Sequence, residues 1–410
     1  MRLTKSFLRL AVLAACGAAG GALAGGLAIG TQSGSGTGNA YAGGAAAAED
    51  ASTVWYNPAG MTRLQGTTNL AAAAHILKPS FEFQNNGSTL GAGTGDGGNA
   101  GDWAYIPQFY ATTKLNDAWS IGAAFNTPFG LKTNYDAGWR GQSIAVESQV
   151  KAYNLNFSLA YKVNDAVSVG GGVNYQKVQI KFSSVLPAPV AGLIEPNLSD
   201  TGTGWNVGVL LQPTAQTRLG AHYRSAINFQ VNGDITAPGA LGGNGAGTAG
   251  LTTPDSLSLS AFHALTGQWD LMADATWTGW SRLKALTVAR TNGAGGTLTT
   301  LPFNWQDTWR GSVGANYKVN DAWKLRAGLA YDKTPTNDVD RTARLPDQDR
   351  TWLAFGAQML IGKAGKLDVG YAHEFIKDAA VNNRNVVGQR LIGSFDNKVD
   401  ILSIQYSHAF

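Results

Sequence analysis

The feature that most constrains this chain is an alternation of apolar and polar side chains that recurs, in runs of roughly ten residues, from Trp119 to Phe410. One run reads Trp323, Lys324, Leu325, Arg326, Ala327, Gly328, Leu329, Ala330, Tyr331 and Asp332. Because successive side chains of a strand point to opposite faces, this run carries apolar groups on one face and charges on the other. A cationic side chain at the middle of a bilayer costs about 2–4 kcal/mol, so the charged face must line a lumen. The alternation therefore predicts an all-β, antiparallel transmembrane β-barrel.

Composition and charge favour a barrel and exclude other classes of protein. Only 14% of the 410 residues are charged, against about 25% in a typical soluble protein. Beyond the N-terminus there is no apolar run of about 20 residues, so strands rather than helices must cross the membrane. The net charge of +4 is spread without a basic tract, so we expect no nucleic-acid partner. The alternative with the same period, a soluble β-sandwich, would not need an export signal or aromatic girdles.

The N-terminus has the layout of a secretory signal. Met1–Arg9 supplies three positive charges, and the apolar stretch that follows ends in the small-residue site Ala22-Leu23-Ala24. We expect residues 1–24 to be a signal peptide and the mature protein to lie in the bacterial outer membrane. The alternative is lipidation at Cys16, although Arg9 leaves only about six apolar residues before it, fewer than the usual 7–15 or so. Cys16 is the only cysteine, so the mature chain should contain neither a disulfide nor a thiol nucleophile.

Short turns and long connections alternate along the remaining sequence. The phrase Lys-x-Asn-Asp-Ala occurs at Lys114, Lys162 and Lys318, and Asn-Asp between two alternating runs is a hairpin signal. Further short turns are expected near Pro213, Thr266 and Lys363. Long loops are expected over Gly87–Gly101, Ser183–Gly204, Asn232–Pro254, Arg290–Pro302, Lys333–Asp349 and Lys377–Asn397. Six short periplasmic turns that join seven long outer hairpins predict a barrel of about fourteen strands over residues 65–410.

The segment before the barrel, residues 25–64, has a different character. Its small residues are unsuited to a spanning strand; Ala45–Glu49 favours a short helix, and Asn57-Pro58 with Gly60 favours a turn. We expect a compact hatch that plugs the lumen. The alternative is a disordered periplasmic leader.

Two parts of the sequence, one within residues 38–61 and one at residues 127–131, resemble a known family. Gly38–Gly43, Ala48–Ser52 and Tyr56–Met61 together resemble the hatch of the FadL-type long-chain fatty acid transporters, and Asn57, Pro58 and Ala59 are similar to the Asn-Pro-Ala motif of that hatch. Thr127–Leu131 resembles the kinked third strand of the family. The resemblance implies passive uptake of hydrophobic compounds across the outer membrane, either long-chain fatty acids or, as in one branch, aromatic hydrocarbons.

The sequence also predicts where the barrel wall is weak. Proline removes one hydrogen-bond donor from a β-ladder and glycine weakens strand packing, so Thr127, Pro128, Phe129 and Gly130 predict a local break. The family resemblance assigns this break as a lateral opening into the outer leaflet. The alternative is a strand end or an edge bulge with no role in transport.

A candidate substrate path follows from a change of phase near the outer rim. Beyond Tyr175 the apolar residues move to the inward face, as a ligand groove would require. The residues that share this inward, apolar position, together with two from the kink, are Leu77, Phe81, Phe83, Phe129, Leu131, Val178, Ile180 and Phe182. The alternative is simple packing against the outer loops.

The lumen should carry charges of both signs. Arg218, His222, Arg224 and Arg326 are candidates to contact the hatch or to bind a fatty carboxylate. No catalytic or metal site is expected: no Ser-rich motif accompanies the histidines, and the sequence has no His/Cys ligand cluster or nucleotide-binding loop. The rival functions are a lipid-hydrolysing outer-membrane enzyme and a general diffusion porin.

The expected partners follow from this location. They are hydrophobic small molecules, outer-membrane lipid and lipopolysaccharide, and the barrel assembly machinery, which would read the terminal aromatic residue Phe410. No cofactor is expected, and the family resemblance favours a monomer.

Overall fold

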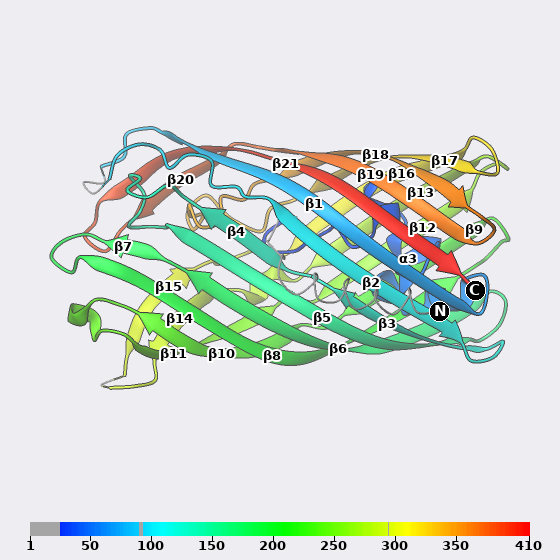
Figure 1. Cartoon of the computed structure of the whole chain (residues 1–410), viewed down its shortest axis with the longest axis horizontal. Coiled ribbons are helices and arrows are strands. Elements are labelled where there is room, and N and C mark those ends of the chain that lie inside the picture. The colour runs from blue at the N-terminus through cyan, green and yellow to red at the C-terminus, as the bar shows by residue number, and fades with distance from the viewer. Residues whose placement is uncertain (1–24, 90–92, 294) are drawn as a thin grey trace, which may run out of the picture.

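The computed structural model describes residues 25–89, 93–293 and 295–410. The expected signal peptide, residues 1–24 with Cys16, lies outside the described residues. Among the described residues, no helix combines the length and the apolar character that crossing a membrane requires. The main body is an antiparallel sheet rolled into a long barrel, whose strands run obliquely to its long axis (Figure 1).

The wall closes because the first and last strands pair with each other. β1 (Thr68–Asn85) pairs with β2 (Ala104–Lys114) on one side and with β21 (Arg390–Ala409) on the other. The other strands are β3 (Trp119–Asn126), β4 (Gly130–Asn134), β5 (Glu147–Lys162), β6 (Val167–Phe182), β7 (Ser184–Leu186), β8 (Gly192–Leu211), β9 (Thr217–Arg224), β10 (Ile227–Thr236), β11 (Gly245–Thr253), β12 (Ser256–Ala264), β13 (Trp269–Thr278), β14 (Ala285–Arg290), β15 (Thr297–Pro302), β16 (Thr308–Lys318), β17 (Trp323–Asp332), β18 (Arg350–Ile361), β19 (Gly365–Ile376) and β20 (Ala379–Arg384). When interrupted strands are taken together, the described residues cross the wall fourteen times, which confirms the predicted barrel.

The burial of alternate residues follows the predicted period. In β17, Leu329 is 51% exposed on the outer face, whereas Arg326 is 3% exposed and faces the lumen. Aromatic pairs near the periplasmic turns, such as Trp119 with Tyr161 and Trp269 with Tyr317, lie on the outer face, where amphipathic rings meet the membrane interface. The outer surface therefore suits hydrocarbon, and the lumen suits polar groups.

The repeated Asn-Asp phrase builds three equivalent turns. In the first, Asn116 Oδ1 accepts hydrogen bonds from the backbone N–H groups of Ala118 and Trp119. Asn164 and Asn320 accept the same pair of bonds in the other two turns. An asparagine side chain that replaces a backbone acceptor in this way stabilises a tight turn, which explains why the phrase recurs.

The outer loops are shorter than the sequence predicted. Much of the expected loops Ser183–Gly204, Asn232–Pro254 and Lys377–Asn397 is strand, because β8, β10, β11 and β20 extend into them, and β15 lies within Arg290–Pro302. These extensions are rich in Gly, Asn and Thr. Backbone hydrogen bonds between strands form whichever side chains are present. The polar composition therefore indicates that these strand segments have no lipid-facing side, and it does not indicate that they are loops. A further outer connection, residues 135–146 between β4 and β5, was missing from the predicted loops.

The N-terminal segment lies inside the barrel. Its short helices are α2 (Gly34–Thr37), α3 (Gly44–Ala47), α4 (Thr53–Tyr56) and the 3₁₀ helix η1 (Pro58–Arg63). Figure 1 shows them within the half of the barrel that carries the C-terminus of the chain. The predicted N-terminal lumenal hatch is therefore confirmed as part of the fold.

Candidate functional site

The Asn-Pro-Ala motif joins the hatch to the barrel wall. The side-chain amide of Asn57 donates to Ala45 O in the hatch (2.8 Å) and to Val209 O in β8 (3.0 Å), while its Oδ1 accepts from the backbone N–H of Ala59 (3.1 Å). Asn57 is completely buried. Gly208 makes room for it, because a Cβ at that position would overlap Asn57 Oδ1. Two of these hydrogen bonds hold the hatch turn together, and the third, from Asn57 to Val209 O, ties the hatch to the wall.

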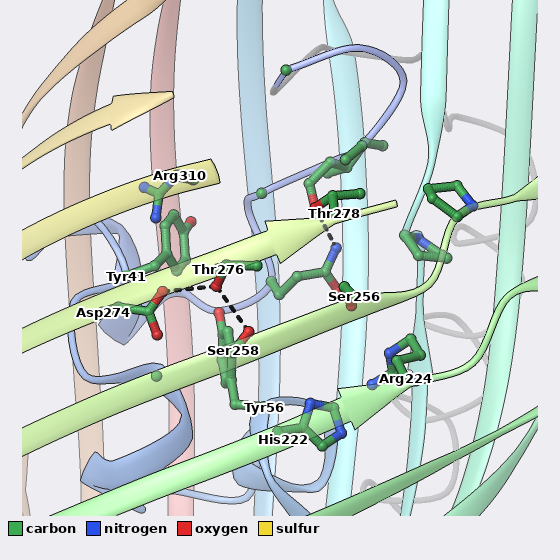
Figure 2. Close-up of a pocket in the computed structure, with 18 of the residues that line it drawn as sticks. Tyr41, Tyr56, His222, Arg224, Ser256, Ser258, Asp274, Thr276, Thr278 and Arg310 are labelled. Atoms are coloured by element: carbon green, nitrogen blue, oxygen red, sulfur yellow. Dashed lines mark hydrogen bonds between the residues drawn. The ribbon is translucent and has the colours of Figure 1, made fainter. Parts of the chain in front are cut away.

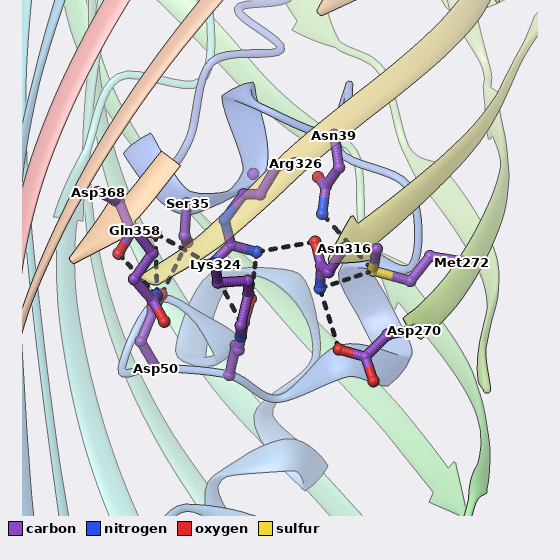
Figure 3. Close-up of polar contacts among 12 residues, drawn as sticks. Ser35, Asn39, Asp50, Asp270, Met272, Asn316, Lys324, Arg326, Gln358 and Asp368 are labelled. Carbon is purple, nitrogen blue, oxygen red and sulfur yellow. Dashed lines mark hydrogen bonds and ion pairs between the residues drawn. The ribbon is translucent and has the colours of Figure 1, made fainter. Parts of the chain in front are cut away.

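A second attachment of the hatch is ionic (Figure 3). Arg326 Nη1 lies 2.8 Å from Glu49 Oε2 in the hatch, and its Nη2 lies 2.9 Å from Asp368 Oδ1 in β19. Lys324 also pairs with Glu49. Burial alone would raise the pKa of Glu49, but Arg326 and Lys324 outweigh it and hold that pKa well below its ordinary value. Glu49 is therefore held in its ionised form against the wall.

Neighbouring polar contacts extend this network. Asp50, on the other side of the same hatch turn, accepts from Ser35 Oγ (2.7 Å) and from Gln405 Nε2 in β21 (2.8 Å). Gln358 Nε2 donates to Asp368, 2.9 Å away. We call the set Glu49, Asp50, Lys324, Arg326 and Asp368 the hatch network.

The wall is interrupted between β3 and β4, at residues 127–129. Below the interruption, β3 pairs with both neighbours, since Phe125 lies opposite Phe109 of β2 and opposite Leu155 of β5. Above it, β5 is the only strand that pairs with β4 among the described residues. Ala104–Gln108 of β2 consequently has no strand partner on this side among the described residues. Pro128 lies at the interruption, which gives the predicted kink and a break in the ladder between the second and third wall strands.

Part of the hatch covers this break from inside. The N–H of Ile29 donates to Pro128 O (2.9 Å), and the N–H of Gly130 donates to Leu27 O (2.9 Å). Gln32 Nε2 donates to Thr127 O (3.0 Å). We call residues 27–32 the strap. Sequence reasoning did not identify the strap, because its residues show no strand period.

Most of the predicted substrate path comes together in one apolar cluster near the outer end. The cluster contains Phe81, Phe83, Leu131, Val178, Ile180 and Phe182, with Phe129 packed against it. Its further members include Tyr135, Trp139 and Phe395, which the sequence did not indicate; the rings of Tyr135 and Trp139 stack 4.1 Å apart. We call this set the outer apolar cluster. Leu77 lies elsewhere, in a separate cluster with Ile29 and Tyr41.

A cavity of about 190 Å³ lies behind the kink, below the outer apolar cluster. Pro128, Phe129, Trp280 and strap residue Ile29 supply its apolar part. Much of the remaining lining is polar, and Figure 2 shows these polar residues: Tyr41, Tyr56, His222, Arg224, Ser256, Ser258, Asp274, Thr276, Thr278 and Arg310. The cavity therefore joins the break in the wall to the polar interior.

The four predicted lumenal candidates take different positions. Arg326 belongs to the hatch network. Arg224 also contacts the hatch, since its guanidinium stacks 3.4 Å from the Trp55 ring centre and donates to Trp55 O (2.9 Å). His222 lines the cavity, whereas Arg218 stacks on Phe262, 4.4 Å from the ring centre, away from the cavity lining.

The buried histidine His75 has a structural role. Its Nδ1 lies 2.6 Å from Ser403 Oγ and its Nε2 lies 3.3 Å from Gln108 Oε1. Across residues 25–410, apart from the undescribed positions 90–92 and 294, no cluster of His, Cys, Asp or Glu has the arrangement needed to hold a metal ion.

The chain is similar in sequence to a known family and to several known proteins. The family of outer membrane protein transport proteins (OMPP1/FadL/TodX) matches residues 15–410. A long-chain fatty acid transport protein of Salmonella typhi is 30% identical over 380 residues, covering 84% of this chain and 86% of its own. Outer membrane protein P1 of Haemophilus influenzae is 30% identical over 383 residues, covering 82% of each chain.

The solved structures agree in fold. A Pseudomonas aeruginosa FadL homologue superposes with a TM-score of 0.88 at 27% identity, covering 94% of this chain and all of that chain. The toluene transporter TbuX of Ralstonia pickettii has a TM-score of 0.66 at 21% identity, covering 92% of this chain and 99% of that chain, and so supports the fold alone. A protein of this kind is a transporter in the outer membrane rather than an enzyme. The chain belongs to the outer membrane protein transport protein family (OMPP1/FadL/TodX).

Proposed function

We propose that the protein takes up hydrophobic compounds passively, by capture at the outer apolar cluster and sideways release through the break at Pro128. The observation that carries this proposal is the position of the break, which lies directly beside both the cluster and the cavity. The free energy of an apolar solute falls when it leaves water for an apolar surface, and it stays low when the solute passes on into membrane hydrocarbon. A path through the wall means that the solute does not have to cross a water-filled channel.

The cargo belongs to one of two classes. The Salmonella typhi relative is a long-chain fatty acid transport protein, and TbuX is a toluene transporter. We infer fatty acids or aromatic hydrocarbons as the cargo of this chain. Contact with lipopolysaccharide, a monomeric state and recognition of Phe410 by the assembly machinery form part of the same proposal.

The strap must move for release to occur. It supplies backbone partners at the kink, with two hydrogen bonds across the Ala28–Phe129 bridge. A typical hydrogen bond contributes only about 0.5–1.5 kcal/mol net, so a bound solute that packs between strap and kink can displace the strap. The strap is then the element that separates a closed wall from an open one.

A reversible disulfide bond between the strap and the kink tests this function. Ala28 and Phe129 face each other as a non-hydrogen-bonded antiparallel pair, in which Cα atoms are about 4.5 Å apart, within the range of a disulfide. In the double variant Ala28→Cys/Phe129→Cys, we expect oxidation to abolish uptake of radiolabelled oleate and toluene by whole cells. Reduction with a thiol should restore uptake.

The single variants Ala28→Cys and Phe129→Cys are the matched controls and should not respond to oxidant. Unchanged uptake by a fully oxidised double variant would refute lateral release at this kink. A porin would behave differently from the protein proposed here, because it would conduct ions steadily in a planar bilayer whether or not the disulfide is formed.

A further inference from the structure

The outward face of the wall beside the break carries neighbouring lysine side chains. In β6, Tyr175 is 51% exposed, and Lys177 is the next outward residue toward the outer end of the barrel. Lys177 lies opposite Tyr153 of β5, and Lys151 of β5 lies opposite Gln179 of β6. Residues one diagonal step apart on the same face of two paired strands are about 7–8 Å from each other. Lys151 and Lys177 are therefore neighbours just above exposed aromatic residues.

Two further lysines belong to the same face. Lys132 of β4 lies opposite Gln149 of β5, which is the outward residue next to Lys151. Lys181 of β6 lies opposite the same Gln149 on the other side. We call Lys132, Lys151, Lys177 and Lys181 the lysine patch.

The protein neutralises only part of the lysine patch. Two of its lysines form ion pairs with carboxylates of neighbouring segments, Lys132 with Asp102 and Lys181 with Glu147 (2.8 Å) and Glu195 (3.4 Å). The other two, Lys151 and Lys177, form no ion pair with a residue that the structure describes. Two positive charges therefore remain unbalanced on this part of the outer face.

Another part of the outer face, on β1 and β21, has a different balance of charge. Lys78 lies opposite Asp400, and Lys398 lies between Asp396 and Asp400 on the outward side of β21. Glu82 lies opposite Asp396. We call Lys78, Glu82, Asp396, Lys398 and Asp400 the mixed face. Its carboxylates outnumber its lysines, so an anion is attracted to the lysine patch and not to the mixed face.

The lysine patch lies at the level of the lipid headgroups and next to the break. Below it, Leu155 and Phe157 of β5 are 42% and 58% exposed on the hydrocarbon side of the wall. A lysine is costly at the middle of a bilayer and costs little near the interface, so the step from these residues to lysine marks the outer interface. Lys151 lies opposite Gly130, the first residue of β4 above the break.

We propose that the lysine patch binds the phosphate groups of lipopolysaccharide in the outer leaflet, with Lys151 and Lys177 as the main contacts. The proposal deepens the lipopolysaccharide contact that forms part of the proposed function. Lysine ammonium groups are common phosphate ligands. Lipopolysaccharide carries two or more phosphates near the headgroup level, whereas most phospholipids carry one, so two adjacent unpaired lysines favour lipopolysaccharide. The bound lipid places acyl chains beside the break, where a solute released sideways first meets hydrocarbon.

The test measures lipid binding to the purified, detergent-solubilised protein by native mass spectrometry. The probes are lipid A with two phosphates, lipid A with one phosphate, and phosphatidylglycerol. We expect the wild type to bind them in that order, with the two-phosphate form tightest. The double variant Lys151→Gln/Lys177→Gln should bind two-phosphate lipid A about thirtyfold more weakly, since each lysine near an anionic lipid contributes about fivefold. Added salt should weaken the wild type more than the double variant.

Lys78→Gln/Lys398→Gln is the matched control, because it removes two outward lysines from the mixed face. It should change lipid A affinity less than about twofold. Retention of the folded, heat-modifiable form on gels shows that each variant assembles.

Three results would overturn the proposal. They are an undiminished affinity for lipid A in Lys151→Gln/Lys177→Gln, an equal loss in the control pair, and binding of phosphatidylglycerol as tight as that of two-phosphate lipid A. Failure of lateral release appears separately, as uptake that is insensitive to the Ala28–Phe129 disulfide.

Discussion

The two halves of the barrel interior differ in how they hold what lies inside them. Toward the C-terminal end, the hatch is fixed by hydrogen bonds and ion pairs with defined partners, such as Asn57 with Val209 and Arg326 with Glu49. Toward the outer end, the outer apolar cluster is dominated by aromatic and aliphatic contacts, such as Phe83 with Phe395 at 5.2 Å. Directional contacts therefore dominate around the hatch, whereas apolar contact dominates in the outer apolar cluster, with a few hydrogen bonds such as the one from Trp139 Nε1 to Ala145 O.

This difference matches what each half must do. A polar network specifies one arrangement, because each hydrogen bond has a required distance and direction. Apolar contact scales with buried area and tolerates different shapes, so one surface can accept several hydrophobic solutes. The hatch half should therefore control whether ions leak, and the outer half should control which solutes enter. Substitutions in the two halves should separate these properties.

The largest effect is expected for Arg326→Leu, which removes the cation between Glu49 and Asp368. Removing one partner of a buried ion pair costs about 3–5 kcal/mol, because a buried charge is left uncompensated. We expect a loosened hatch, seen as a large rise in planar-bilayer conductance and a lower unfolding temperature. Lys284→Leu, at an outer loop and outside the hatch network, is the control. Low conductance in a folded Arg326→Leu barrel would show that the ion pairs do not hold the hatch.

A smaller effect is expected for Asn57→Ala, which deletes the three hydrogen bonds of the hatch motif. A buried group left without a partner costs about 1–3 kcal/mol, so conductance should rise less than in Arg326→Leu. Gly208→Ala reaches the same contact from the wall side, since the added Cβ would press on Asn57 Oδ1. If the two variants differ strongly in conductance, the contact between Asn57 and β8 is not what fixes the hatch.

The outer half should respond in the opposite way. Ile180→Thr exchanges buried apolar surface of the outer apolar cluster for a hydroxyl, at about 0.8 kcal/mol for each methylene lost. Two carbons are lost, so we expect the apparent affinity for oleate or toluene uptake to fall about fifteenfold, with no change in conductance. Ile121→Thr, on the lipid-facing side of β3, is the matched control. A conductance rise in Ile180→Thr would contradict the division between the halves.

The sequence predicted the fold well, because the barrel depends on local periodicity. The alternation that places Arg326 inward and Leu329 outward is visible in the chain itself, and the turn asparagines are short-range signals. The outer hairpins were misjudged because strands above the membrane lose the outward, lipid-facing apolar phase and keep only an inward one, as in β10. The polar segments of these hairpins were interpreted as loops, but their backbones continue the hydrogen-bonded ladder of the sheet.

The candidate site was harder to predict, because it depends on contacts between distant segments. Pro128 and Gly130 indicated the kink, yet nothing in residues 27–32 showed that they would bond to it. The same holds for Trp139, in the connection between β4 and β5, and for Phe395, in β21, which join the outer apolar cluster from positions far apart in sequence. Charged lumen residues could be identified by phase, but whether Arg224 contacts the hatch or a solute depends on the position of Trp55.

The smallest expected effect concerns pH and tests the ionic half of the comparison. The pKa of Glu49 lies well below its ordinary value of 4.5, so the folded state binds fewer protons than the unfolded state near that pH. The stabilisation from a depressed carboxyl pKa is fully present above the unfolded value and is lost as pH falls through the folded value. Hatch conductance should therefore stay low from pH 7 to pH 5 and rise only in strong acid. Glu49→Gln, which carries no ionisable group, should conduct more than the wild type at pH 7 and lose this acid-dependent rise, whereas a wild-type rise already at pH 5 would mean that Arg326 and Lys324 do not keep Glu49 ionised.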